Sequence, residues 1–256
     1  MQFHEFGEPT HPHILLIHGG GNSWWNYLRQ ARVLAEDYHV ILPTLDGHGE
    51  EWEKEYISTE DSADKILAYI DEHCGGHLFA LSGISLGAQI VTEILSRRKD
   101  IAKKAIIESG LCFPCPFMAW YCKLTVKLFG KIIFGEKACK WQIDMMPKLV
   151  PEKMLYPEEI KNYYITDMPK TPLKTLITIY NTYMSNYQLK DSLRETQADV
   201  MYWYGGKEMK AIKRSALMFK EYVPSCQIYE AKGYNHGYLS IYLPEEWLAL
   251  AIPFFQ

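Results

Sequence analysis

Apolar residues along this chain gather in short continuous runs that are typical of buried β-strands. The run Ile14–Ile17 has the length and uniformity of a strand that is covered on both faces. Turn-forming glycines follow several of these runs, which marks their ends. The runs that predict strands are Ile14–Ile17, His39–Leu42, His77–Ser82, Ala105–Ile107, Val200–Tyr204 and Gln227–Glu230.

Between these runs the apolar residues recur at helical spacing. Leu86, Ile90 and Ile94 repeat every fourth residue, as on the buried face of a helix. Helices are predicted over Trp24–Tyr38, over Thr59–Cys74, from Leu86 onward and from about Pro244 to the end. Alternating strands and helices predict an α/β fold, with a mainly parallel, doubly wound sheet that carries helices on both faces.

The alternation stops between residues 111 and 193, where helical patterns, aromatic residues and prolines are mixed. An insertion of this kind after a sheet strand is best interpreted as a helical lid over the ligand crevice. We therefore predict a core formed by residues 1–110 and 194–256, and a lid formed by residues 111–193.

One helix within the predicted lid combines an apolar stripe with a row of lysines. Leu124, Leu128 and Ile132 repeat every fourth residue, and so do the lysines at 123, 127 and 131. Such a helix is able to rest on an anionic membrane surface. A lysine row that is simply solvated is the more common explanation, so weak membrane contact through the lid is one hypothesis of two.

Composition narrows the class of protein only slightly. The chain has 256 residues, 48% of them hydrophobic, and a net charge of −4, which gives no reason to expect nucleic acid as a partner. The first residues lack the basic and apolar pattern of a secretion signal, and no apolar run is long enough to cross a bilayer. We expect a cytoplasmic protein.

Six cysteines are scattered without the regular spacing of a disulfide framework. Cys112 and Cys115 form a C-x-x-C pair, but prolines interrupt it and no second ligand pair follows. We expect ordinary buried thiols, and no metal or organic cofactor.

The stretch Gly83–Gly87 carries the strongest chemical signal, because a strand must turn into a helix around Ser85. Glycines on either side allow that sharp turn, which lifts the serine hydroxyl clear of the sheet. The free N–H groups at the start of the helix stabilise negative charge that develops beside it. Ser85 is therefore a candidate nucleophile; the alternative is a serine that only caps the helix.

Three successive glycines, Gly19 to Gly21, follow the first buried strand and leave backbone N–H groups unshielded. We predict an oxyanion hole formed by the amides of Gly20 and Leu86. A later loop at a strand end contains Asp46 and His48, which we expect to hold that loop by hydrogen bonds rather than to act in catalysis.

A serine nucleophile needs a base and an acid that orients the base. Of the nine histidines, His236 lies in a glycine-flanked loop after the last strand, at the sheet edge that also carries Ser85. Glu208, just beyond Gly205 and Gly206, fits best as the acid, and Glu108 at the end of its own strand is the alternative.

In its motifs the chain resembles the α/β-hydrolase family. The matching stretches are His18-Gly19-Gly20-Gly21, Asp46-Gly47-His48-Gly49, Gly83-Ile84-Ser85-Leu86-Gly87, Gly205-Gly206-Lys207-Glu208 and His236-Gly237. The resemblance implies the α/β-hydrolase fold and a triad of nucleophile, acid and histidine in that chain order, namely Ser85, Glu208 and His236. A glutamate takes the place of the more common aspartate.

The resemblance also implies acyl transfer through an acyl-enzyme on Ser85. We expect a small apolar carboxylic ester as substrate, contacted by Gly19, Gly21, Trp24, Phe113 and Phe117. A thioesterase, an acyltransferase, a lyase on the same scaffold or a non-catalytic ligand-binding protein remain alternatives. The sequence does not distinguish a monomer from a dimer.

Overall fold

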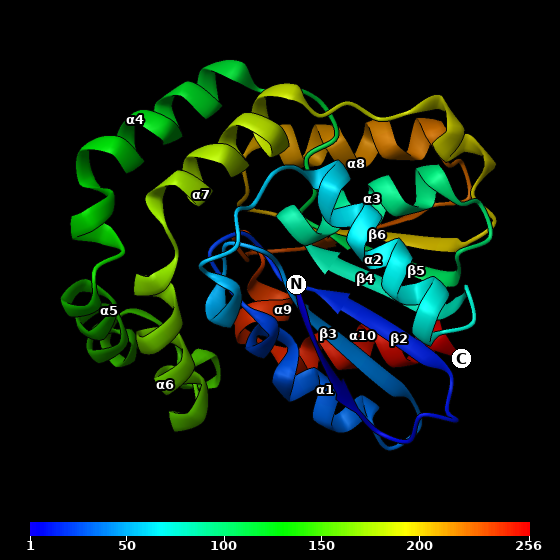
Figure 1. The fold of residues 1–256 in the computed structure, drawn as a ribbon, viewed down its shortest axis with the longest axis horizontal. Coiled ribbons are helices and arrows are strands. Elements are labelled where there is room, and N and C mark those ends of the chain that lie inside the picture. Colours follow the sequence, from blue (N-terminus) through cyan, green and yellow to red (C-terminus); the bar gives the residue numbers. More distant parts are fainter.

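Seven strands form one sheet in the computed structural model, which describes all 256 residues (Figure 1). Their order across the sheet is β1-β3-β2-β4-β5-β6-β7. The edge strand β1 runs antiparallel to β3, and every other neighbouring pair is parallel, which confirms the predicted mainly parallel sheet. The strands are β1 Gln2–Phe6, β2 His13–Ile17, β3 His39–Thr44, β4 Leu78–Ile84, β5 Ala102–Glu108, β6 Asp199–Gly205 and β7 Gln227–Ala231.

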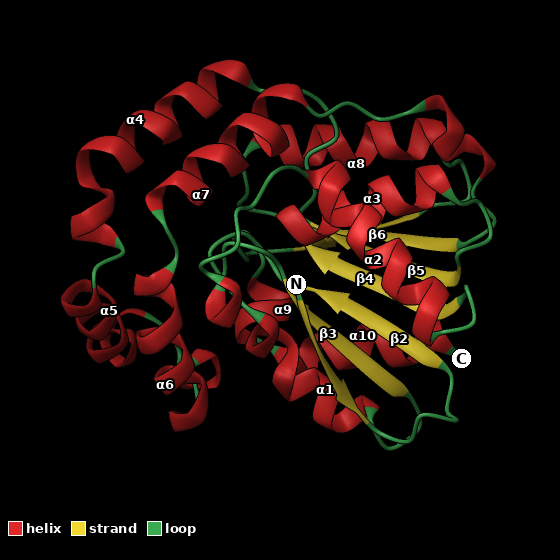
Figure 2. Ribbon diagram, viewed as in Figure 1, coloured by secondary structure: helices red, strands yellow, loops and turns green.

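Helices cover both faces of the sheet, as Figure 2 shows. Successive residues of a strand point to opposite faces; accordingly, Leu15 and Ile17 of β2 pack into one core, and Ile14 and Leu16 pack into the other. This two-sided burial explains why the strand sequences are continuously apolar. One face carries α2 (Thr59–His73), α3 (Leu86–Arg97) and α8 (Lys210–Tyr222), and the other carries α1 (Leu28–Leu34) and α10 (Pro244–Phe255).

Two regions at the start of the chain differ from the prediction. The sequence analysis did not identify β1, a half-exposed edge strand that lacks a continuous apolar run. The single helix predicted over Trp24–Tyr38 is instead a 3₁₀ turn, η1 (Trp24–Tyr27), followed by the short helix α1. The chain between β6 and β7 also forms α8, for which we made no prediction.

A group of helices lies between β5 and β6 and extends to one side of the sheet, at the left of Figure 1. None of the helices of the chain is both long enough and apolar enough to cross a membrane. The insertion occupies the segment expected to form a lid, and its action as a lid stays a prediction. It contains α4 (Pro116–Ile133), α5 (Glu136–Leu149), α6 (Glu158–Asp167), α7 (Leu173–Ile179) and the π-helical turn η5 (Tyr180–Asn186).

Short elements complete the structure. The five-residue helix α9 follows the loop that carries His236. The 3₁₀ turns are η2 (Gly49–Glu51), η3 (Glu152–Met154), η4 (Met168–Lys170) and η6 (Asp191–Glu195).

Candidate active site

Ser85 occupies a strained turn between β4 and α3. Its backbone has φ 53° and ψ −112°, a conformation that residues other than glycine rarely adopt. A Cβ atom on Gly87 would lie 2.2 Å from the carbonyl oxygen of Ile17, so the turn leaves no space for a side chain there. The Ser85 amide donates to the carbonyl of Glu108 at 2.8 Å, which holds the turn against the neighbouring strand. These features fix the serine at the carboxyl edge of the sheet.

Two backbone amides belong to residues that line the cavity beside the candidate nucleophile. Leu86 is the first residue of α3, and N–H groups in the first turn of a helix have no partner within the helix. Gly20 lies in the loop after β2, and no backbone carbonyl accepts from its amide. The adjacent Gly19 approaches Ser85 closely, since a Cβ atom on Gly19 would lie 3.6 Å from the Ser85 Cβ. Gly20 and Leu86 both line the cavity that contains Ser85.

Glu208 and His236 are joined directly. His236 Nδ1 lies 2.7 Å from Glu208 Oε2, and the Glu208 side chain is only 2% exposed. The other carboxylate oxygen accepts from the Gly205 amide at 2.6 Å and from the Ser109 hydroxyl at 2.7 Å. Hydrogen bonds to both oxygens fix the carboxylate, and the carboxylate in turn orients the imidazole with a proton on Nδ1.

Glu108, the alternative acid, does not contact the imidazole. It is fully buried, and its Oε1 accepts from the Ser240 amide at 3.3 Å while Oε2 has no partner. Burial raises the pKa of Glu108 to about 7, and the nearby charge of Glu208 acts in the same direction. Of the two carboxylates, it is therefore Glu208 that pairs with His236.

A largely apolar cavity of about 450 Å³ connects these groups. Ser85, Glu208 and His236 all line it, although no hydrogen bond joins Ser85 to His236. Such contacts are commonly long before substrate binds. The apolar wall comes from the core and from the helical insertion, and it consists mainly of Ile84, Leu86, Leu111, Leu176, Ile179, Met184, Met209, Ile212 and Ile241.

Tyr183 is a polar group within this wall that the sequence analysis did not single out as a site residue. It lies on the π-helical turn η5, is buried, and lines the same cavity as Ser85. Burial raises the pKa of Tyr183, so the phenol stays protonated and is able to donate. Single π-helical turns are frequent at functional sites, and they are not recognisable from apolar spacing.

Several expected substrate contacts lie away from the cavity. Gly19 lines it, whereas Gly21, Trp24, Phe113 and Phe117 do not. Trp24 packs among His4, Phe6 and Tyr163. Phe113 lies under the guanidinium of Arg214, and Phe117 is 77% exposed on the outer face of α4. The sequence located these aromatic residues near the site but not the direction in which each side chain points.

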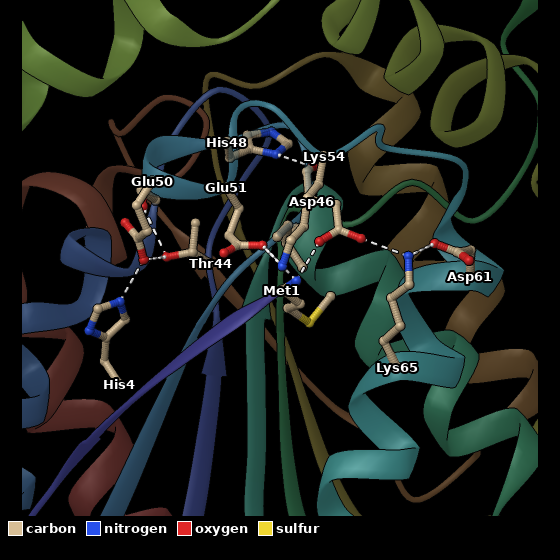
Figure 3. Close-up of polar contacts among 12 residues, drawn as sticks. Met1, His4, Thr44, Asp46, His48, Glu50, Glu51, Lys54, Asp61 and Lys65 are labelled. Atoms are coloured by element: carbon tan, nitrogen blue, oxygen red, sulfur yellow. Dashed lines mark hydrogen bonds and ion pairs between the residues drawn. The ribbon is translucent and has the colours of Figure 1, made fainter.

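The loop that follows β3 acts as a support, as Figure 3 shows for Asp46 and His48. Asp46 accepts from Lys65 at 2.6 Å, and its other oxygen lies 2.6 Å from the Met1 amine. His48 is fully buried and lies outside the cavity lining; its Nδ1 bonds to the carbonyl of Asp46 at 3.0 Å. These contacts agree with the interpretation that both residues hold the loop.

A second buried histidine joins this loop to the glycine loop. His18 Nε2 accepts from the Leu45 amide at 3.0 Å, and its Nδ1 bonds to the carbonyl of Gly19 at 2.8 Å. Burial lowers the pKa of His18 to about 3 and that of His48 to about 4, so both imidazoles are neutral in the folded chain. The neutral His18 thereby fixes the backbone next to Gly20.

The C-x-x-C pair forms neither a disulfide nor part of a ligand cluster. Cys112 is buried and Cys115 half-buried, and both are free thiols. Burial raises the pKa of the Cys112 thiol to about 12 and also raises that of Cys115. No group of three or more histidine, cysteine or acidic side chains is arranged to hold a metal ion.

The order of the sheet strands and the strained serine turn are features of a known fold. Residues 12–121 match the family described as alpha/beta hydrolase fold, and the structure matches solved structures of that fold along its whole length. The chain therefore has the α/β-hydrolase fold.

Individual relatives are distant. An AB hydrolase superfamily protein of Gibberella zeae is 28% identical over 111 residues, which is 41% of this chain and 38% of that protein. A putative alpha/beta hydrolase family protein from Desulfitobacterium hafniense is similar in structure, with a TM-score of 0.73, 22% identity and coverage of 100% of both chains. A carboxylesterase of Nitrososphaera gargenis has a TM-score of 0.75 at 17% identity, covering 99% of this chain and 93% of that one.

Proposed function

We propose that this protein is a serine hydrolase that cleaves carboxylic esters with an apolar acyl or aryl group. The observation that carries the proposal is the 2.7 Å contact between His236 Nδ1 and Glu208 Oε2 in the wall of the cavity that contains Ser85. A similar fold is described for carboxylesterases, which supports the hydrolase class but not a particular substrate.

The reaction proceeds in two steps. Ser85 Oγ attacks the ester carbonyl carbon while His236 Nε2 accepts its proton, and Glu208 stabilises the imidazolium that forms. The alcohol leaves with the proton from His236, which gives an acyl-enzyme. Water then attacks the acyl carbon with His236 as the base, and the acid is released.

The backbone amides of Gly20 and Leu86 donate to the oxyanion in both steps. Removing one oxyanion donor typically lowers turnover by about 100-fold to 1000-fold. Tyr183 is a further donor from the insertion, and its hydroxyl is suited to hydrogen-bond the substrate oxygen nearest Ser85. The apolar wall formed by residues such as Leu176 and Ile179 accepts the acyl or aryl group.

The test is the intact mass of the protein after exposure to a small fluorophosphonate. Such a reagent reacts rapidly only with a serine that a working base activates. We expect one adduct on the wild type and none on the Ser85→Ala variant. A folded wild type without an adduct would refute the proposal and favour a ligand-binding protein.

Substitution of the two carboxylates distinguishes their roles. Glu208→Gln keeps the shape but loses the charge that stabilises the imidazolium, so it should lower the hydrolysis of p-nitrophenyl esters at least 100-fold. Glu108→Gln is the matched control and should retain most of the activity. The opposite ranking would show that Glu108 is the acid.

Ester turnover also separates the remaining alternatives. A burst of p-nitrophenol equal to the enzyme concentration indicates an acyl-enzyme. A lyase that uses the same three residues for proton transfer would give no burst. A panel of acyl chain lengths, with oxygen esters and thioesters compared at equal length, then defines the preferred substrate.

A further inference from the structure

Helix α4 presents apolar side chains to solvent and small ones to the protein. Its buried residues are Ala119, Val126 and Gly130. A Cβ atom on Gly130 would lie 2.8 Å from Leu173 of α7, so α4 packs closely there. The side chains with large exposed surfaces are Phe117, Trp120, Tyr121, Leu124, Leu128, Phe129, Ile132 and Ile133.

Five of these residues form one outward stripe. Phe117, Tyr121, Leu124, Leu128 and Ile132 follow one another at intervals of three or four residues, which places them on one side of a helix. Leu128 is 62% exposed and Ile132 is 71% exposed. An ordinary surface helix has the reverse arrangement, with its apolar stripe toward the core. Contiguous exposed apolar surface of this kind usually marks an interaction site.

The charges beside the stripe all have the same sign. The charged residues of α4 are Lys123, Lys127 and Lys131, and the helix contains no acidic residue. Lys123 donates to Asn181, whereas Lys127 and Lys131 are exposed and form no ion pair. The whole chain carries a net charge of −4, so this basic strip differs from the rest of the molecule. A partner that covers the stripe must therefore present negative charge to these lysines.

We propose that the outer face of α4 binds the surface of an anionic lipid bilayer, with the helix axis parallel to the membrane plane. Apolar side chains on one face and lysines at its border are the features of helices that lie in the interface. Trp120 and Tyr121, near the start of α4, are residue types that prefer the headgroup region.

A second copy of the chain fits this face less well. Two copies that met through the same stripe would bring Lys127 and Lys131 of each close to those of the other, which is repulsive. An anionic membrane instead attracts both lysines. Cys122, on the same helix, lines the cavity that contains Ser85, so a bound membrane would lie close to that cavity. The binding itself does not rest on the proposed hydrolase activity.

Vesicle sedimentation tests the binding. We expect the protein to sediment at low salt with phosphatidylcholine vesicles that contain phosphatidylserine, and much less with phosphatidylcholine alone. The triple variant Phe117→Ser, Leu128→Ser, Ile132→Ser should bind roughly 100-fold more weakly, because it loses most of the apolar contact. Leu217→Ser, at a site on α8 that is 54% exposed, is the matched control and should bind as the wild type does.

The lysines are tested separately. Each basic side chain near an anionic surface contributes about fivefold to the partition coefficient, so Lys127→Gln with Lys131→Gln should weaken binding about 25-fold. Lys103→Gln, at an exposed position on β5, is the control and should have no such effect.

Two results would overturn this inference. One is the absence of sedimentation with anionic vesicles by a folded wild type. The other is a dimer in solution that dissociates in the triple serine variant, because that would identify a second copy as the occupant. Ser85→Ala should bind vesicles normally, so the membrane contact and the proposed chemistry can fail independently.

Discussion

The buried carboxyl group of Glu108 gives a quantitative prediction for stability. The group is fully buried, and its Oε2 has no hydrogen-bond partner. Its pKa rises from 4.5 to about 7, mainly because burial disfavours the charged form. In the folded chain it therefore keeps a proton that the unfolded chain releases. The contribution of Glu108 to folding stability should therefore fall as the pH rises from about 4.5 through 7.

The substitution Glu108→Gln removes this penalty, because the amide does not titrate. A shift from 4.5 to about 7, at about 1.4 kcal/mol per pH unit, corresponds to about 3 kcal/mol between pH 4.5 and pH 8. The free energy of unfolding of the variant, minus that of the wild type, should increase by this amount over that range. Any constant effect of the amide on packing cancels in the comparison.

Urea unfolding followed by tryptophan fluorescence and by circular dichroism provides the measurement, at several pH values from 4.5 to 8. Coincident curves from the two probes establish that the two-state analysis applies. Thr171→Val, a neutral substitution at another buried side chain without a partner, is the control and should give a difference independent of pH. If the difference in the free energy of unfolding for Glu108→Gln is also independent of pH, the carboxyl group of Glu108 does not have a raised pKa.

Three further substitutions test contacts that build the site. Gly87→Ala should cost more than about 3 kcal/mol, because the added carbon lies 2.2 Å from the backbone oxygen of Ile17; a normal melting temperature would contradict this. Gln89→Leu should cost about 3 kcal/mol in urea unfolding, since the buried amide donates to two backbone carbonyls, both in the insertion; an unchanged midpoint would show that water replaces it. Trp25→Phe should cost about 2 kcal/mol by the same assay, because Asp167 loses a buried donor at 2.9 Å; equal loss in an Asp167→Ala background, which has no acceptor, would contradict that origin.

The sheet was predictable because its signals are local. A strand covered on both faces must be apolar at every position, and Ile14–Ile17 meets that requirement without any knowledge of its neighbours. The serine turn is local at Gly83, where a Cβ atom would lie 2.4 Å from the backbone of Gly87, whereas Gly87 is required by the approach of the Ile17 carbonyl on β2. The edge strand β1 is solvated on part of its surface and has no such requirement.

The contacts of the candidate site were less predictable, because they depend on how distant elements pack. Ser109 donates to Glu208 only because β5 lies beside β6 in the sheet, with Glu108 paired to Trp203. A prediction of the strand order would have shown that Ser109 and Glu208 are neighbours. Tyr183 lines the cavity of Ser85 from a π-helical turn that no apolar spacing indicates. The inner face of α4 is occupied by small residues, so Phe117 points outward. The sequence alone does not show which face of this helix packs against the protein.

The buried pair His18 and His48 makes the molecule a proton acceptor when it unfolds. Both imidazoles are neutral in the folded chain, with pKa values of about 3 and 4, whereas an exposed histidine takes up a proton below about 6.5. Unfolding at acidic pH therefore takes up as many as two protons at these rings, and their contribution to stability should fall as the pH drops from 6.5 toward 4. Glu108 acts in the opposite direction, but with one proton rather than two. Both rings are fully buried, so we expect protons to reach them only when the surrounding structure opens. Mild acid should thus reduce the fraction of folded molecules without loosening the glycine loop in the molecules that remain folded.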